Sequence, residues 1–190
     1  DMVGDIEAIL ELGISYDVRT TNFSRVAYIS KDSYRKLITD VLDGLDIKFL
    51  EKLRKQHQIK EILTDCGFYP SNVSMNLQDL VAARAQKIEL LPGELIPDGL
   101  CIGCDGKDYI IQINDKVLDI NSVMSPVFGS LLHLIDSQEK FKVEIIRPTT
   151  AVFLAMENVK WLMDCPLIRY RLHQIVRWRK NHLCLMKNKS

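Results

Sequence analysis

Residues 87–161 constrain the fold of this chain more than any other part of its sequence. Pro92 and Gly93 give a turn signal at the start of a stretch rich in strand-forming residues. Phe128 and Gly129 interrupt that stretch, and a polar, basic helical pattern closes it. The change from helical to strand-like period predicts a mainly-β (α+β) unit with helices before and after it.

The strand-like stretches are separated by turn residues. Asn114 and Asp115 lie between Ile113 and Val117 and predict a hairpin turn. Strands are predicted within residues 87–96, 108–120, 141–146 and 149–155, with Arg147-Pro148 between the last two. Pro166 suits the first turn of a closing helix, because proline lacks an N–H that this turn would leave unpaired. Its predicted apolar stripe comprises Leu167, Ile168, Leu172, Ile175 and Val176.

The front of the chain mixes both patterns. Residues 16–30 are rich in β-branched and aromatic side chains and predict two short strands around residues 20–22. Lys31 and Asp32 then open a helical pattern, which residues 47–53 resume after the Asp43-Gly44 break. These segments predict a small unit of strands followed by helices.

A domain boundary is predicted near residues 66–74, where Gly, Pro, Asn and Ser lie between two helical patterns. Asn76 is expected to cap the helix that follows, with Asp79 in its first turn, where the helix dipole favours a carboxylate. The apolar positions of that helix are Leu77, Leu80, Val81 and Ala85.

Composition narrows the function classes. With 190 residues, 47% hydrophobic and 26% charged, the chain can form one large domain or two small ones. Lys+Arg and Asp+Glu both total 25, so the chain has no net positive charge that would attract nucleic acid. Nucleic acid is therefore not expected as a partner. The local exception is residues 165–190, which carry seven cations and no Asp or Glu.

The cysteines and the hydropathy indicate a cytoplasmic location. Five scattered cysteines, in a chain large enough to fold without disulfides, favour a reducing compartment. No signal peptide is recognisable, and no apolar run approaches the roughly 20 residues of a membrane helix. Because Asp1 is not an initiator methionine, we expect this segment to belong to a longer protein.

Several motifs together resemble the cyclic-nucleotide-binding domain family. Residues 91–96, followed by Asp98-Gly99, resemble that family's entry turn, and residues 109–111 with 116–117 resemble its next hairpin. Residues 128–132 (Phe-Gly-Ser-Leu-Leu) fall where the family has Phe-Gly-Glu and a short helix, and residues 149–156 fall at its last strand. The resemblance implies a cyclic-nucleotide-binding-like double-stranded β-roll with helical segments before and after it.

A second, partial resemblance lies at the front. Residues 4–6 (Gly-Asp-Ile), 18–20 and 26–30 are similar to the second half of the same domain. The resemblance therefore implies a tandem arrangement. Residues 1–70 would be the C-terminal part of a first unit plus connecting helices, and residues 75–190 a complete second roll.

The resemblance also implies where a ligand would bind. In the family, backbone N–H groups of the short helix and an arginine hold the cyclic phosphate, and a glutamate accepts a bond from the ribose hydroxyl. The candidate ligand-binding residues are Gly4, Asp5, Ile6, Phe128, Gly129, Ser130, Leu131 and Lys140.

The glutamate and the arginine with which the family holds its ligand are not present at the matching positions. Ser130 occupies the glutamate position, and the arginine position falls at about Glu139, whose carboxylate would repel a phosphodiester. In the front half, Asp5 keeps the acid, but Ile14 takes the arginine position. We therefore predict a degenerate pocket without a resident cofactor. A slip of one or two residues would place Lys140 or Lys142 at the arginine position, and cyclic AMP or cyclic GMP remains the alternative ligand.

No motif predicts an enzyme or a metal site. Nucleophile elbows, phosphate-binding P-loops and His-Glu-x-x-His helices are all missing from the sequence. Cys101 and Cys104 have metal or redox spacing, but without a second pair they predict only two thiols in a β-turn. His133, His173 and His182 could complete a zinc site only on paper.

The basic end of the chain admits two interpretations. Trp178 among Arg177, Arg179 and Lys180 could contact acidic lipid or a protein partner, or these cations could form the solvated face of the closing helix. The aromatic residues are expected in the core: Phe23, Tyr28, Phe128, Phe141, Phe153 and Trp161.

The resemblance implies a regulatory role. In families with such rolls, the roll controls an attached ion channel, sodium/proton exchanger or kinase, so its main partner is the remainder of its own polypeptide, and a homodimer is an option. A membrane transporter, such as a sperm-type sodium/proton exchanger, is the first hypothesis. The alternative is a scaffold that binds a protein partner through the basic helix.

Overall fold

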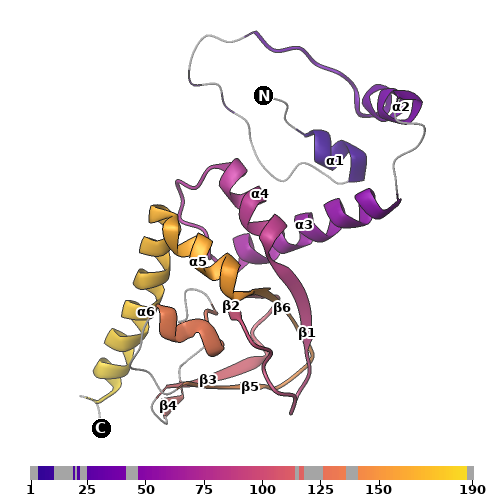
Figure 1. Ribbon diagram of the computed structural model, residues 1–190. Helices are drawn as coiled ribbons and strands as arrows, with labels where there is room; N and C mark the ends of the chain where they lie inside the picture. The colour runs from indigo at the N-terminus through magenta and orange to yellow at the C-terminus, as the bar shows by residue number, and fades with distance from the viewer. Residues whose placement is uncertain are drawn as a thin grey trace. The chain divides into compact units, whose positions relative to one another are not determined.

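The computed structural model describes residues 4–10, 19, 21, 25–41, 47–113, 116–117, 126–135 and 141–187 (Figure 1). The chain divides into two compact units, Asp1–Lys55 and Gln56–Ser190. None of the described helices combines the length and the apolar character that a membrane span requires.

The first unit contains the helices α1 (Asp5–Leu10) and α2 (Lys31–Val41), which contact each other. Ser30 precedes α2 and accepts a hydrogen bond from the Ser33 N–H at 3.2 Å. The strand predicted up to Ser30 is wrong for residues 25–30, which form no regular structure. Tyr28, predicted as a core residue, is 89% exposed, so this segment buries no apolar face that would stabilise a strand.

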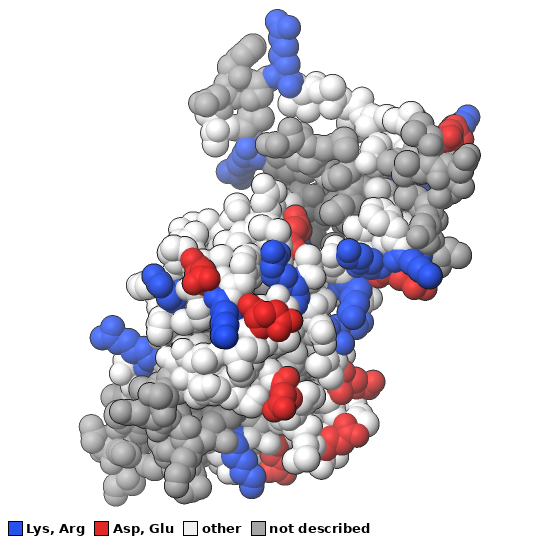
Figure 2. Space-filling model, in the orientation of Figure 1, with Lys and Arg blue, Asp and Glu red and all other residues white. Residues whose placement is uncertain are grey.

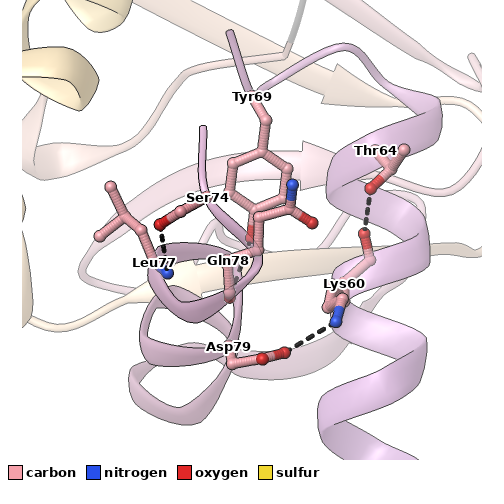
Figure 3. Close-up of polar contacts among 7 residues, drawn as sticks. All are labelled: Lys60, Thr64, Tyr69, Ser74, Leu77, Gln78 and Asp79. Atoms are coloured by element: carbon pink, nitrogen blue, oxygen red, sulfur yellow. Dashed lines mark hydrogen bonds and ion pairs between the residues drawn. The ribbon is translucent and has the colours of Figure 1, made fainter. Parts of the chain in front are cut away.

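The helices α3 (Ile47–Asp65) and α4 (Met75–Arg84) precede the sheets. Ser74, rather than the predicted Asn76, caps α4, because its hydroxyl accepts from the Leu77 N–H at 3.3 Å. Figure 3 shows how the two helices are joined: Lys60 pairs with Asp79 at 2.8 Å. In the same view Tyr69 donates its hydroxyl to the Gln78 carbonyl at 3.3 Å, and Thr64 donates to the Lys60 carbonyl at 2.8 Å.

The loop at residues 66–74 is part of the core of the second unit. Phe68 is fully buried and packs in one cluster with Ile59 and Leu63 of α3. The two compact units divide between Lys55 and Gln56, before the boundary that the sequence predicted. The assignment of residues 1–70 to the remnant of a first roll stays a prediction.

The strands of the second unit, among the described residues, form two three-stranded antiparallel sheets. They are β1 (Gln86–Leu90), β2 (Leu100–Cys104), β3 (Tyr109–Ile113), β4 (Lys116–Val117), β5 (Phe141–Ile145) and β6 (Thr149–Leu154). One sheet has the order β1-β6-β2 and the other β4-β3-β5 (Figure 1). Ile113 pairs with Lys116, so the predicted hairpin is confirmed, although its turn residues lie outside the described ones.

The two faces of β2 and β6 explain how the core is divided. Leu100 and Ile102 of β2 join a cluster with the helices, whereas Cys101 and Cys104 join a second cluster with Tyr109 and residues of both sheets. Regular alternation would put positions 101 and 104 on opposite faces. A β-bulge between Cys101 and Gly103 adds one residue and returns Cys104 to the side of Cys101.

The helices α5 (Met156–Asp164) and α6 (Pro166–Lys187) follow the last strand. The apolar stripe of α6 is confirmed except at Leu167, which is 43% exposed. Its buried members are Ile168, Leu172, Ile175 and Val176. Trp161 of α5 is partly buried, and the guanidinium of Arg84 lies 4.1 Å from its ring centroid.

Candidate functional site

The candidate ligand-binding segment is the loop at residues 128–131, named here the Gly129 loop, which leads into the short 3-10 helix η2 (Ser130–Leu134). Gly129 has a φ of 126°, which side chains of L-residues rarely adopt. A Cβ atom at this position would lie only 2.3 Å from the carbonyl oxygen of Gly99. Glycine is therefore required here both by the backbone conformation and by the close approach of a second segment.

Gly99 forms hydrogen bonds with two groups of the Gly129 loop, one of which, the Leu131 N–H, is a donor that the loop would offer to an anion. Its N–H donates to the Ser130 hydroxyl oxygen at 3.0 Å, and its carbonyl accepts from the Leu131 N–H at 3.2 Å. Gly99 is buried and itself has a φ of 148°. The loop is thus bonded to the protein's own backbone at the position where the resemblance places a cyclic phosphate.

Phe128 anchors the loop in the interior. It is fully buried, and its ring centroid lies 6.1 Å from those of Tyr109 and Phe153. Its backbone exchanges two hydrogen bonds with Cys101 of β2, at 2.7 and 3.2 Å. Phe128 and Phe153 are therefore core residues, as predicted. The Leu131 side chain is buried as well, so it is the backbone and Ser130 that form the surface of this loop.

No described contact places a residue of the predicted arginine position, or the alternative cations Lys140 and Lys142, at this loop. Glu139 and Lys140 lie outside the described residues, and so does Ile14 of the front half. Lys142, in β5 opposite Gln112, is exposed. The predicted degeneracy of the arginine position stays a prediction.

The front segment repeats one feature of the Gly129 loop. Gly4 has a φ of 81° and is followed by the short helix α1, as Gly129 is followed by η2. The Gly4 carbonyl accepts from the Ala8 N–H at 2.9 Å, and Leu10 is buried. The side chains of Asp5 and Ile6 lie outside the described ones, so their ligand-binding role also stays a prediction.

Comparisons with known proteins support the fold. No family model matches the sequence, and no curated protein matches it. Among solved structures, a match is the chain titled "Sp-2Cl-cAMPS bound to PKAR CBD2", at 16% identity and a TM-score of 0.50. The match covers 72% of this chain and 94% of that one. The chain contains a cyclic-nucleotide-binding-like β-roll with flanking helices. At this identity the likeness shows the fold alone.

A second group of residues lies around the other end of β2. A surface cleft of about 340 Å³ is lined by residues that include Cys66, Cys104, Asp105, Lys107 and Tyr109. The hydrogen bond between Cys104 and Cys101 raises the pKa of the Cys104 thiol, and burial raises it further. Burial and then the neighbouring thiols raise the pKa of Tyr109. Both groups are therefore protonated at neutral pH.

The prediction of two thiols in a β-turn is wrong. Cys101 and Cys104 lie within β2, their sulfur atoms are 3.7 Å apart, and both side chains are buried. Among the described residues, no group of three or more His, Cys, Asp or Glu side chains is arranged to hold a metal ion. His133 is exposed, and its Nδ1 lies 2.7 Å from the Ser130 carbonyl oxygen.

The cations of α6 do not all belong to a solvated face. Arg179 is fully buried, so it cannot contact lipid in this conformation, whereas Arg177 is exposed and the side chain of Lys180 is outside the described ones. Arg171 donates from Nη2 to the Gly67 carbonyl at 2.6 Å and from Nε to the Phe68 carbonyl at 3.3 Å. On the face shown in Figure 2, described acidic and basic side chains are interspersed.

Sequence reasoning missed the role of Gly99. The Asp98-Gly99 pair was recognised as part of the entry turn, but nothing in its local pattern points to Gly129, which lies 30 positions further along. The signal that could have suggested a contact is the presence of two glycines beside strand-like segments, where glycine often marks a close backbone approach.

Proposed function

We propose that the β-roll is a regulatory coupler whose Gly129 loop holds no cyclic nucleotide. The proposal rests on two hydrogen bonds: the Gly99 carbonyl occupies the Leu131 N–H, and the Gly99 N–H donates to the Ser130 oxygen and holds this side chain against Gly99. A phosphate at this loop would compete with an internal partner that is already in place.

The free-energy cost of breaking these internal hydrogen bonds disfavours nucleotide binding. A phosphate that took the Leu131 N–H would leave the buried Gly99 carbonyl without this donor, and displacing Ser130 would do the same to the Gly99 N–H. An unsatisfied buried backbone group costs about 1–3 kcal/mol. Two such groups would offset most of what charge-assisted bonds to the phosphate contribute, which is about 1.5–3 kcal/mol each.

The side chains do not make up for this loss. Ser130 brings no carboxylate to accept from a ribose hydroxyl, and its oxygen already accepts from Gly99. The sequence places Glu139 near the arginine position, where its charge would repel a phosphodiester. The backbone contacts and the side-chain chemistry thus point in the same direction.

The contacts between helices support a coupling role. Arg171 of α6 bonds to the carbonyls of Gly67 and Phe68 in the loop before α4. Arg84 of α4 stacks on Trp161 of α5, and Asn158 donates to the Arg84 carbonyl at 3.0 Å. Because helices before and after the roll are bonded directly to one another, a displacement of one would be passed to the other.

We further propose that the roll serves a larger protein, with a membrane transport domain of the sodium/proton exchanger type as the first candidate. The basis is family analogy. The exposed Leu167 and Tyr170 on α6 favour the second candidate, a scaffold that binds a protein partner. The coding sequence upstream of Asp1 separates the two: several apolar runs of about 20 residues support the transporter, and a short polar start supports the scaffold.

Calorimetric titration of the 190-residue chain with cyclic AMP and with cyclic GMP tests the proposal. We expect no binding heat for either nucleotide, while circular dichroism and a cooperative thermal transition show that the chain is folded. The double variant Ser130→Glu/Glu139→Arg serves as the matched comparison, because it introduces both ligand-holding side chains. It keeps the bond from the Leu131 N–H to the Gly99 carbonyl but removes the Ser130 hydroxyl that accepts from the Gly99 N–H. A dissociation constant in the micromolar range for the unchanged chain would overturn the proposal.

A further inference from the structure

We propose that Cys101 and Cys104 form a redox-sensitive dithiol, which a hydroperoxide converts to a disulfide within strand β2. The inference rests on the β-bulge, the distance between the sulfur atoms and the cleft beside Cys104. It neither requires nor excludes a nucleotide at the Gly129 loop.

The geometry brings the two thiols together. Because of the bulge between Cys101 and Gly103, both side chains enter the same cluster, and the sulfur atoms approach to 3.7 Å. A disulfide requires about 2.05 Å, so the sulfurs must move together by about 1.7 Å. The Cys101 sulfur also lies 3.3 Å from the Gly103 carbonyl oxygen, so its side chain is already turned along the strand toward Cys104.

A route for the oxidant exists at one of the two thiols. Cys104 lines the cleft at the end of β2, together with Lys107 and Tyr109, whereas Cys101 is fully buried behind it. The hydroperoxide therefore meets Cys104 first. Because the hydrogen bond with Cys101 and burial raise the pKa of Cys104, the resting Cys104 thiol is protonated and its oxidation is slow.

The reaction balances in two steps. The Cys104 sulfur attacks the terminal peroxide oxygen, the O–O bond breaks, and a sulfenic acid and one water (or alcohol) molecule form. The Cys101 sulfur then displaces that hydroxyl group as water, and the S–S bond forms. The two thiols lose two electrons and two protons in total, and the hydroperoxide is the oxidant reduced.

Formation of the disulfide would also change the hydrogen bonds that hold the Gly129 loop. Cys101 exchanges two backbone hydrogen bonds with Phe128, which precedes Gly129 directly. Drawing Cys101 toward Cys104 shortens β2 locally and weakens this bridge. Oxidation would thus loosen the loop that Gly99 and Phe128 otherwise hold.

Peptide mapping tests the pairing. Trypsin releases residues 88–107 as one peptide that contains both cysteines, and residues 61–84 as another that contains Cys66. After treatment of the native chain with hydrogen peroxide, denaturation and alkylation, we expect peptide 88–107 to be two hydrogen atoms lighter and unalkylated. Dithiothreitol should restore both alkylation sites. Cys66→Ser is the matched control and should leave this result unchanged, while Cys101→Ser should abolish it.

Three outcomes would overturn the proposal. Both cysteines of peptide 88–107 could stay alkylated while Cys66 is oxidised, each could pass to sulfinic acid without an S–S bond, or a cross-link could join peptides 61–84 and 88–107. The coupling to the loop has its own readout, amide hydrogen exchange at residues 128–131. We expect faster exchange in the oxidised chain, and unchanged exchange would show that the disulfide does not reach the loop.

Discussion

The two ends of strand β2 have different surroundings: a hydrogen-bonded loop at its start and a surface cleft at its end. At its start, Gly99 forms two hydrogen bonds with the Gly129 loop, one to the Ser130 hydroxyl oxygen and one from the Leu131 N–H, at the position where the resemblance places a ligand. At its end, Cys104 borders a cleft of about 340 Å³ with charged and ionisable neighbours. Only four residues, 100–103, lie between Gly99 and Cys104.

The two ends of β2 thus differ in the groups that they present. The roll has the glycines and the aromatic anchor that shape the loop, whereas Cys104, whose buried thiol borders the cleft, lies at the other end of the strand. Tyr109 belongs to both regions, because it packs against Phe128 and also lines the cleft. Substitutions at the two ends should therefore have different consequences.

The largest effect is expected from Gly129→Ala. A Cβ at this position meets the Gly99 carbonyl oxygen at 2.3 Å and is strained by a φ of 126°, so we expect a loss of about 3 kcal/mol or more of unfolding free energy. Urea unfolding followed by tryptophan fluorescence measures it. Gly93→Ala is the matched control: its φ is 80°, but a Cβ there has no neighbour within 4 Å, and about 1–2 kcal/mol is expected. Equal losses would show that the contact with Gly99 contributes nothing.

A smaller effect is expected at alkaline pH. Because burial raises the pKa of Tyr109 above its usual value near 10, the unfolded chain releases this proton before the folded chain does. The stabilisation is complete below pH 10 and is lost as the pH rises, by about 1.4 kcal/mol per pH unit above 10. Tyr109→Phe should lose less stability between pH 9 and pH 11 than the unchanged chain. An identical slope would show that Tyr109 titrates normally.

The smallest effect is expected from Ser130→Ala. The substitution removes the acceptor of the buried Gly99 N–H, which should cost about 1 kcal/mol in unfolding free energy. Because it also frees Gly99 from one of its two bonds, it should speed hydrogen exchange at Leu131. Ser33→Ala in the first unit is a control, since its hydroxyl contact is exposed. No change at Leu131 would mean that Gly99 is held by the Leu131 bond alone.

Local patterns predicted most elements of the second unit, with the exception of strand β2, where the sequence predicted a turn at Cys101 and Cys104. The strands at residues 86–90, 109–113, 141–145 and 149–154, the hairpin to β4 and the helix from Pro166 follow from periodicity and from turn residues, which act over a few positions. The predictions that failed depended on distant partners. Residues 25–30 have the composition of a strand, but they bury no apolar face. Leu167 continues the apolar stripe of α6 in the sequence, but its side chain is exposed.

The candidate site was predictable only in outline. Its position at Phe128, Gly129 and Ser130 came from the order of motifs, but the bonding of the loop to Gly99 joins residues 31 positions apart and leaves no local signal. The same holds for Arg171, which reaches carbonyls more than 100 positions earlier in the chain. The burial of Arg179 contradicts the pattern of a basic surface helix for the same reason.

The sequence by itself determined most strands, turns and helices of the second unit, because those choices depend on side-chain period and on residues such as Gly93 and Pro166. Only the tertiary structure decided that Gly99 fills the Gly129 loop and that a bulge brings Cys101 beside Cys104. Both results depend on how strands pack in space, where a backbone approach or a shift of one residue changes which groups meet.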